Sequence, residues 1–141
     1  GTWMTRRSCL PSMWRATFSS ARAAAMTSAS GASAATLIEA RGGTARQLKA
    51  AGKALGLVDQ LTIRVGRSPS AWPASERFEL VFLDPPYADD PGPALLAAAE
   101  VCLGRVVLEA ATSRAVLTPE GLQLVKARRY GDTTIHLFEV A

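Results

Sequence analysis

One segment of the sequence combines a six-residue apolar run with an abrupt, rigid end. Phe78–Leu83 is apolar except for Glu79, which is typical of a strand buried on both faces of a sheet. Asp84 ends the run, and Pro85 and Pro86 follow, which lack N–H donors and restrict φ. Because nearly continuous apolar strands occur in parallel sheets covered on both sides, this segment predicts the interior of an α/β domain.

Strand and helix patterns alternate along the rest of the chain. Strands are expected at residues 35–39, 61–65, 78–83 and 105–109, and at 122–130 and 133–140 around a Gly131-Asp132 turn. One helix is expected after residue 44, where Thr44 and Gln47 have capping-box spacing, and Gly56 is its stop signal. A second is expected to open at Asp90-Pro91 and to run through Leu103.

This alternation predicts an α/β fold with a doubly wound, mostly parallel sheet of the Rossmann-like type. Helices are expected on both of its faces, and the last two strands form an antiparallel hairpin. The expected domain covers residues 31–141. Residues 1–30 contain four arginines, no acid and no sustained period, so we expect a poorly specified segment there.

Composition excludes some classes of protein. The chain has 141 residues, 48% of them hydrophobic and 20% charged, which is globular, and no apolar run approaches the roughly 20 residues of a membrane helix. The net charge of +4 lies in the N-terminal part, because residues 39–141 hold 12 basic and 12 acidic residues. The charge of the body therefore does not by itself predict nucleic-acid binding.

Two acids occupy positions where parallel sheets bind ligands, beyond the carboxyl ends of strands. Glu39 ends the first expected strand and Asp84 the third. Each is also explained by a solvated strand end, but at such a position a carboxylate can accept hydrogen bonds from ribose hydroxyls.

The four residues Asp84-Pro85-Pro86-Tyr87 form the sharpest motif. A stiff turn explains the two prolines but not the acid before them or the ring after them. Asp84 and the Pro85 carbonyl can accept both protons of an exocyclic amine while Tyr87 stacks on the base. The motif therefore predicts a site that positions an amine for attack on an electrophile.

At these residues the sequence resembles a known family. Residues 78–87 are similar to the fourth motif of S-adenosylmethionine-dependent amino-methyltransferases, and Tyr130-Gly131-Asp132-Thr133 narrows the resemblance to RsmD-type 16S rRNA guanine-amine methyltransferases. Leu37-Ile38-Glu39 and Val107-Leu108-Glu109 fall where that family has comparable segments. The resemblance covers about residues 31–141.

The resemblance implies a role for each matching residue. Glu39 would hold the ribose of S-adenosyl-L-methionine, Asp84 would lie beside the cofactor, and Asp84, Pro85, Pro86 and Tyr87 would form the catalytic motif that holds a guanine extruded from its RNA helix. Arg128 and Arg129 would contact RNA phosphates, although two arginines on an edge strand also suit a solvated face. The implied partner is 16S rRNA or the small ribosomal subunit, in the cytoplasm, without metal or membrane.

The N-terminal part departs from the family's pattern. The family places a strand and a Gly-rich cofactor loop before the segment equivalent to residues 31–39, whereas residues 17–30 contain no glycine. We therefore expect this part to be divergent, truncated or frame-shifted. Two alternatives stay open: an inactive remnant that binds RNA or protein, and an amine methyltransferase with a DNA adenine or protein amide acceptor.

Several other polar residues predict no chemistry. His136 is expected as a partly buried strand residue, Cys102 as a packed thiol in the second helix, and Asp90 as a helix cap. Cys9 and Cys102 lack the spacing of a disulfide framework or a zinc site.

Overall fold

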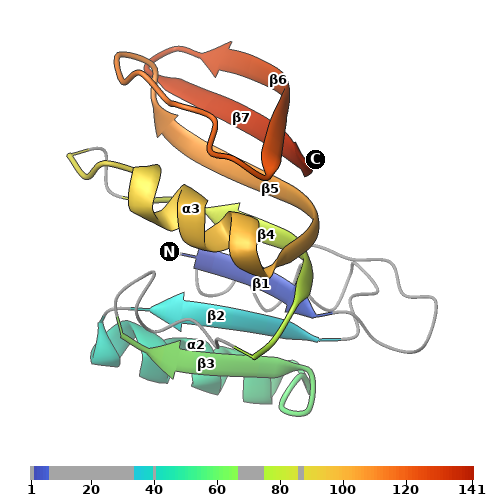
Figure 1. Cartoon of the computed structure of the whole chain (residues 1–141). Helices are drawn as coiled ribbons and strands as arrows, with labels where there is room; N and C mark the ends of the chain where they lie inside the picture. The colour runs from blue at the N-terminus through green and yellow to red at the C-terminus, as the bar shows by residue number, and fades with distance from the viewer. Residues whose placement is uncertain (1, 7–33, 40, 67–74, 86–87) are drawn as a thin grey trace.

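The computed structural model describes residues 2–6, 34–39, 41–66, 75–85 and 88–141. Within them the chain forms a seven-stranded sheet of order β3-β2-β1-β4-β5-β7-β6 (Figure 1). The helices are α2 (Gly42–Ala54) and α3 (Gly92–Val101). The strands are β1 (Thr2–Arg6), β2 (Ala35–Glu39), β3 (Leu61–Val65), β4 (Phe78–Leu83), β5 (Cys102–Ala111), β6 (Leu122–Tyr130) and β7 (Thr133–Val140).

Two parallel strand pairs confirm part of the predicted sheet. β2 pairs with β3, and β4 pairs with β5 with Leu83 opposite Leu108. β7 runs antiparallel to both β5 and β6, which confirms the C-terminal hairpin. Its turn contains Gly131 at φ 61°, a conformation that suits glycine.

The first strand differs from the expected architecture. Residues 2–6, for which the sequence pattern predicts no element, form β1, and β1 is antiparallel to both β2 and β4. Thr2 lies opposite Ile38 on one side and Leu83 on the other. The sheet is therefore mixed rather than mostly parallel, because a central strand runs against its two neighbours (Figure 1).

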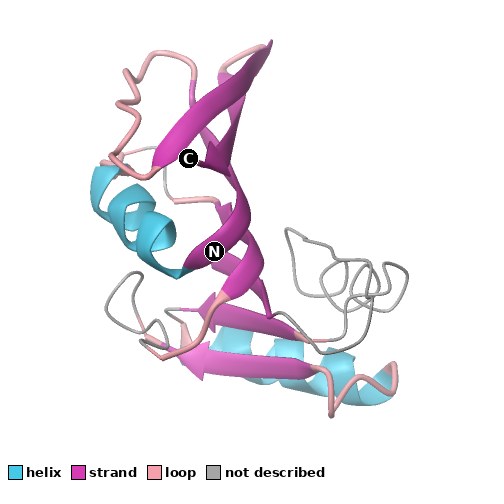
Figure 2. Cartoon of the chain, turned by 45° about the vertical axis from the view of Figure 1, so that its right-hand side comes forward, coloured by secondary structure: helices cyan, strands magenta, loops and turns pink. Residues whose placement is uncertain are grey.

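The two helices cover opposite faces of the sheet (Figure 2). Leu37 packs with Leu48 of α2, whereas the next residue, Ile38, belongs to the cluster that contains Leu95 of α3. Since successive side chains of a strand point to opposite faces of the sheet, α2 and α3 lie on opposite faces of the sheet. The predicted covering of both faces is confirmed.

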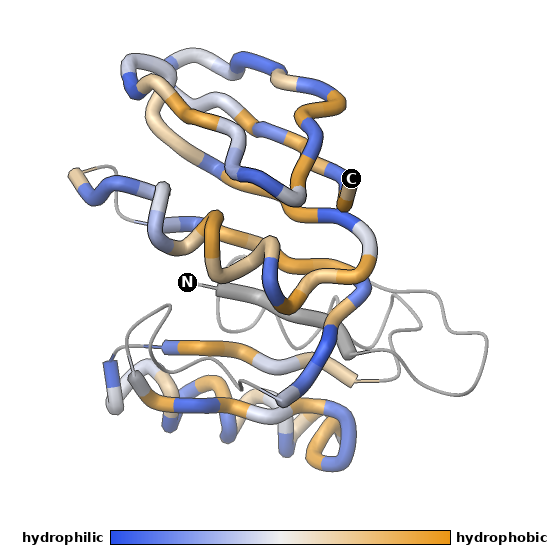
Figure 3. Tube along the Cα trace, in the orientation of Figure 1, coloured by the Kyte–Doolittle hydropathy of each residue, from blue (hydrophilic) through white to orange (hydrophobic). Residues whose placement is uncertain are grey.

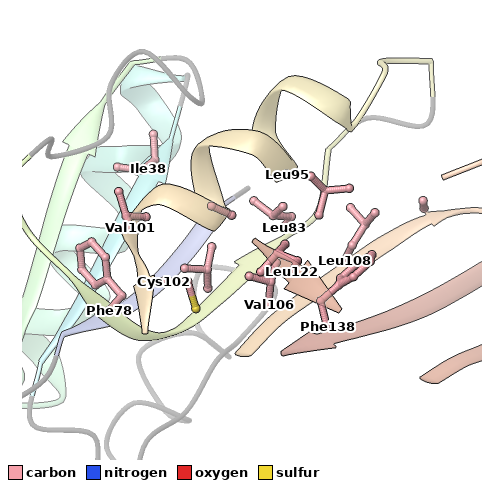
Figure 4. Packing of buried hydrophobic residues seen from close by; sticks show 13 residues of the cluster. Ile38, Phe78, Leu83, Leu95, Val101, Cys102, Val106, Leu108, Leu122 and Phe138 are labelled. Atoms are coloured by element: carbon pink, nitrogen blue, oxygen red, sulfur yellow. The ribbon is translucent and has the colours of Figure 1, made fainter. Parts of the chain in front are cut away.

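The main core lies between α3 and the central strands. Its largest fully buried side chains are Phe78, Phe138, Leu83, Leu95, Leu108, Val81 and Val106. Figure 4 labels all of these except Val81. The hydropathy colouring shows the same apolar zone along β4 and β5 (Figure 3). Burial of each such side chain contributes about 1.5–3 kcal/mol, which makes β4 and β5 a firm support for the residues at their ends.

The predicted limits of two helices and one strand need correction. The capping box is wrong, because the Ala45 amide already donates to the Arg41 carbonyl (2.9 Å), which places Thr44 inside the first turn. The second helix ends at Val101 rather than at Leu103, because Cys102 is extended and pairs with Phe78 of β4. Strand β5 is accordingly longer than the expected 105–109.

Two smaller expectations hold in part. The N-cap of α3 is Pro91 rather than Asp90, but Oδ1 of Asp90 accepts a hydrogen bond from the amide of Gly92, the first residue of the helix (2.9 Å). Cys102 is a buried thiol, although in a strand, and its Sγ donates to the Arg105 carbonyl (3.2 Å). None of the helices that the structure describes has the length and apolar character needed to cross a membrane.

Candidate active site

Three acidic residues lie at the same edge of the sheet. Ile38 and Leu83 flank Thr2 in register, and Leu83 lies opposite Leu108. The residues that follow these three strand positions are Glu39, Asp84 and Glu109. The carboxyl ends of β2, β4 and β5 therefore bring the predicted pair, Glu39 and Asp84, to one edge together with a third carboxylate.

Glu39 is half-buried and held in place. Its Oε1 accepts a hydrogen bond from the backbone amide of Arg41 (2.9 Å), just before α2 begins. One strand, β1, separates β2 from β4, so the backbones of β2 and β4 are about 10 Å apart at this edge. A ligand held by both Glu39 and Asp84 must therefore extend across the end of β1.

Asp84 and Pro85 directly follow the buried end of β4. Both are half-buried, whereas Leu83 is only 1% exposed. Packing of β4 therefore fixes the point from which the motif leaves the sheet. Pro86 and Tyr87, the other two residues of the predicted motif, lie outside the described residues.

Glu109 is a member of this edge that the site prediction missed. Burial and the neighbouring negative charge of Asp84 raise the pKa of the Glu109 carboxyl. The sequence carried the signal that would have found it, because the apolar strand 105–109 ends in an acid as 35–39 does. The structure adds the proximity of Asp84, which makes the edge electronegative.

Arg128 and Arg129 lie on the outermost strand, β6, and both are exposed. Arg128 is opposite Ile135, which is itself opposite Glu109, so these arginines lie near the same edge but two strands beyond β5. The Arg128 guanidinium lies 5.2 Å from the centre of the Tyr130 ring, and Arg129 Nε donates to the Gly131 carbonyl (2.9 Å). Contacts within the hairpin thus orient both side chains.

β1 runs from the carboxyl edge of the sheet to the opposite edge. Its first residues lie at the carboxyl edge, and Arg6 lies at the opposite edge, beside Phe78. In the described residues, the chain therefore leaves the central strand at the edge opposite to Glu39 and Asp84. Residues 17–30, where the glycine-free stretch falls, lie outside the description.

Among the residues that the structure describes, no three His, Cys, Asp or Glu side chains lie close enough together to hold a metal ion.

Comparisons with known proteins agree with this architecture. A structure described as "conserved hypothetical protein- streptococcus pyogenes" is 26% identical, with a TM-score of 0.68 over 82% of this chain and 76% of the other. "Putative methyltransferase yhhF from Escherichia coli" is 18% identical, with a TM-score of 0.70 over 84% and 69%. The 16S rRNA methyltransferase RmtF in complex with S-adenosyl-L-homocysteine is 17% identical, with a TM-score of 0.58 over 75% and 47%.

No curated protein matches the sequence. A family model does match, over residues 18–139, and it therefore begins within the segment where the sequence pattern predicts no element. This match spans most of the chain and includes all of the edge residues described above. The chain belongs to the family described as Conserved hypothetical protein 95.

Proposed function

We propose that this protein is an S-adenosylmethionine-dependent methyltransferase whose acceptor is the exocyclic amine of a guanine in 16S rRNA. The observation that carries the proposal is the placement of Glu39 and Asp84 at one carboxyl edge, on either side of the central strand. Ligands of open α/β sheets bind at this edge. The fold likeness to structures described as methyltransferases supports the same class.

Each edge residue has a proposed task. Glu39, oriented by the Arg41 amide, accepts hydrogen bonds from the ribose hydroxyls of the cofactor. Asp84 and the Pro85 carbonyl accept the protons of the guanine amine, which aims its lone pair, and Tyr87 stacks on the base. S-adenosylmethionine supplies an electrophilic methyl group when it is bound. Arg128 and Arg129 contact RNA phosphates at the outer strand.

The described residues place a carboxylate for the ribose at Glu39, oriented by the Arg41 amide. Residues 17–30, however, contain no glycine, the residue type that lets a backbone loop approach a cofactor closely. This observation favours a second candidate, a domain that binds RNA without methylating it. The two candidates differ in whether the protein binds S-adenosylmethionine.

Calorimetric titration and a methylation assay test the proposal. The protein is expected to bind S-adenosylmethionine and to methylate unmodified small-subunit RNA in preference to adenine-containing DNA or a protein amide. Asp84→Asn should lower kcat by at least about 100-fold, because the amine loses a charged acceptor, and Glu39→Gln should weaken cofactor binding about 10-fold.

Asp59→Asn is the matched control, since Asp59 is exposed in the turn before β3, at the opposite edge of the sheet. It should behave as the wild type. RNA binding without cofactor binding would establish the second candidate, and methylation of DNA or protein alone would change the acceptor.

A further inference from the structure

Hydrogen bonds link the turn between β6 and β7 to the segment that follows β5. The Thr112 amide donates to the Asp132 carbonyl (2.7 Å), and the Thr112 hydroxyl donates to the Gly131 carbonyl (3.1 Å). The hydroxyls of Thr112 and Thr134 are also 2.9 Å apart. Hydrogen bonds therefore connect Thr112, the first residue after β5, to the hairpin of β6 and β7.

The next turn carries an arginine to the loop after Asp84. The Arg114 amide donates to the Ala111 carbonyl (3.0 Å), which closes a turn, and Arg114 is half-buried. Its Nη2 donates to the carbonyl oxygen of Ala88 (3.2 Å), four residues after Asp84. The donor of this bond is a charged guanidinium, and the bond lies at an exposed position.

The hydrogen bond from Arg114 to Ala88 adds a third point of attachment to the connection between β4 and α3. β4 holds one end at Leu83, and at the other end Oδ1 of Asp90 accepts a hydrogen bond from the Gly92 amide. Arg114 supplies the anchor between them, at Ala88. Ala88 therefore has less freedom to move relative to β5 than it would have without this hydrogen bond.

We propose that Arg114, held by Thr112, is a positioning residue that fixes the Asp84 loop in the geometry needed for methyl transfer. This rests on the proposed function of Asp84. These hydrogen bonds also give a structural role to the Tyr130-Gly131-Asp132-Thr133 turn. The carbonyls of Gly131 and Asp132 accept hydrogen bonds from Thr112. Displacement of a reacting group by about 1 Å costs on the order of 100-fold in rate, so a distant anchor of this kind matters for catalysis.

A competing task for Arg114 is direct contact with the substrate. An open cavity of about 400 Å³ lies beside it, lined by Ala111, Ser113, Arg114 and Ala115. An RNA phosphate bound there would also need the guanidinium. The two tasks separate kinetically, because a positioning residue changes kcat whereas a uniform substrate contact changes KM.

The test compares Arg114→Met, Arg114→Lys and Thr112→Val with the wild type, at saturating S-adenosylmethionine and varied small-subunit RNA. Arg77→Met is the control, because Arg77 is exposed at the other end of β4 and its Nη1 also donates to a backbone carbonyl, that of Glu76 (3.0 Å). Amide hydrogen exchange of the peptide spanning residues 84–92 is measured on the same variants.

Arg114→Met should lower kcat about 10- to 100-fold with little change in KM for RNA or in cofactor affinity. Thr112→Val should act in the same direction, and Arg114→Lys should restore part of the rate because its ammonium can still donate to Ala88. Exchange in residues 84–92 should become faster in Arg114→Met and stay unchanged in Arg77→Met.

Unchanged exchange in Arg114→Met would overturn the proposal, and so would a raised KM at constant kcat. If even the wild type transfers no methyl group, the proposed function fails. The exchange experiment then still decides whether Arg114 fixes the loop.

Discussion

At the scale of single residues, the carboxyl edge depends on where strands end. Glu39 and Asp84 were predictable from sequence because each follows an apolar strand, and parallel strands bring their ends together. Arg114 was not predictable, because its partner Ala88 is 26 residues away and only the packing of β5 beside β4 brings the two together. Tyr87 lies outside the described residues, so its stacking on a base stays a prediction.

A pH-dependent stability is expected from Glu109. Its pKa is raised by burial and by Asp84, so the ionised form destabilises the native state. This cost is fully present above the raised pKa and disappears as the pH falls below the value for the unfolded chain. Glu109→Gln should therefore raise the free energy of unfolding at pH 8, by less than about 1 kcal/mol because the side chain is only partly buried.

Urea denaturation at pH 8 and near pH 4 measures this difference, which should shrink at the lower pH. Glu120→Gln, at an exposed position outside the edge, serves as the control. Equal effects of the two substitutions at both pH values would contradict the electrostatic account.

At the scale of elements, close backbone packing overrides helical periodicity at the start of β5. The apolar spacing favoured a helix through Leu103, but Cys102 pairs with Phe78, and Gly104 lies against the Glu79 backbone. A Cβ at residue 104 would collide with the Glu79 carbonyl oxygen. The helix therefore ends where the chain must approach β4 more closely than a side chain allows.

Gly104→Ala should destabilise the protein by about 1–3 kcal/mol, because the backbone of β4 or β5 must shift to admit the methyl group. Thermal or urea unfolding measures the loss. Gly43→Ala is the matched control, since a Cβ there meets only the end of the Arg46 side chain at 3.9 Å. A similar loss in both variants would show that the close approach is not the cause.

At the scale of the whole molecule, β1 joins two halves of the sheet. β2 and β3 with α2 lie on one side of it, and β4, β5, β7 and β6 with α3 lie on the other (Figure 1). β1 pairs along its length with β2 and β4, so the alignment of Glu39 with Asp84 depends on it. A strand in this position needs hydrogen bonds on both sides.

Met4→Pro should therefore weaken the sheet by on the order of 3 kcal/mol, because proline removes a backbone donor from a central strand. Limited proteolysis should cut the chain faster in β2 and β3, and hydrogen exchange there should rise. Met4→Ala keeps the amide and serves as the control. If both variants resist proteolysis equally, β1 does not hold the halves together.

The sequence by itself determined the α/β alternation, five of the strands within their predicted limits, the final hairpin and the two acids at strand ends. These features follow from local patterns: apolar runs, turn glycines and the residues that terminate strands. The tertiary structure alone decided that residues 2–6 occupy the centre of the sheet in the opposite direction, that the second helix stops at Val101, and that Arg114 reaches Ala88. Residues 2–6 read Thr-Trp-Met-Thr-Arg and lack the longer apolar run that marks Phe78–Leu83, so the local sequence does not indicate a strand there. The place and direction of this strand follow from its pairing with β2 and β4.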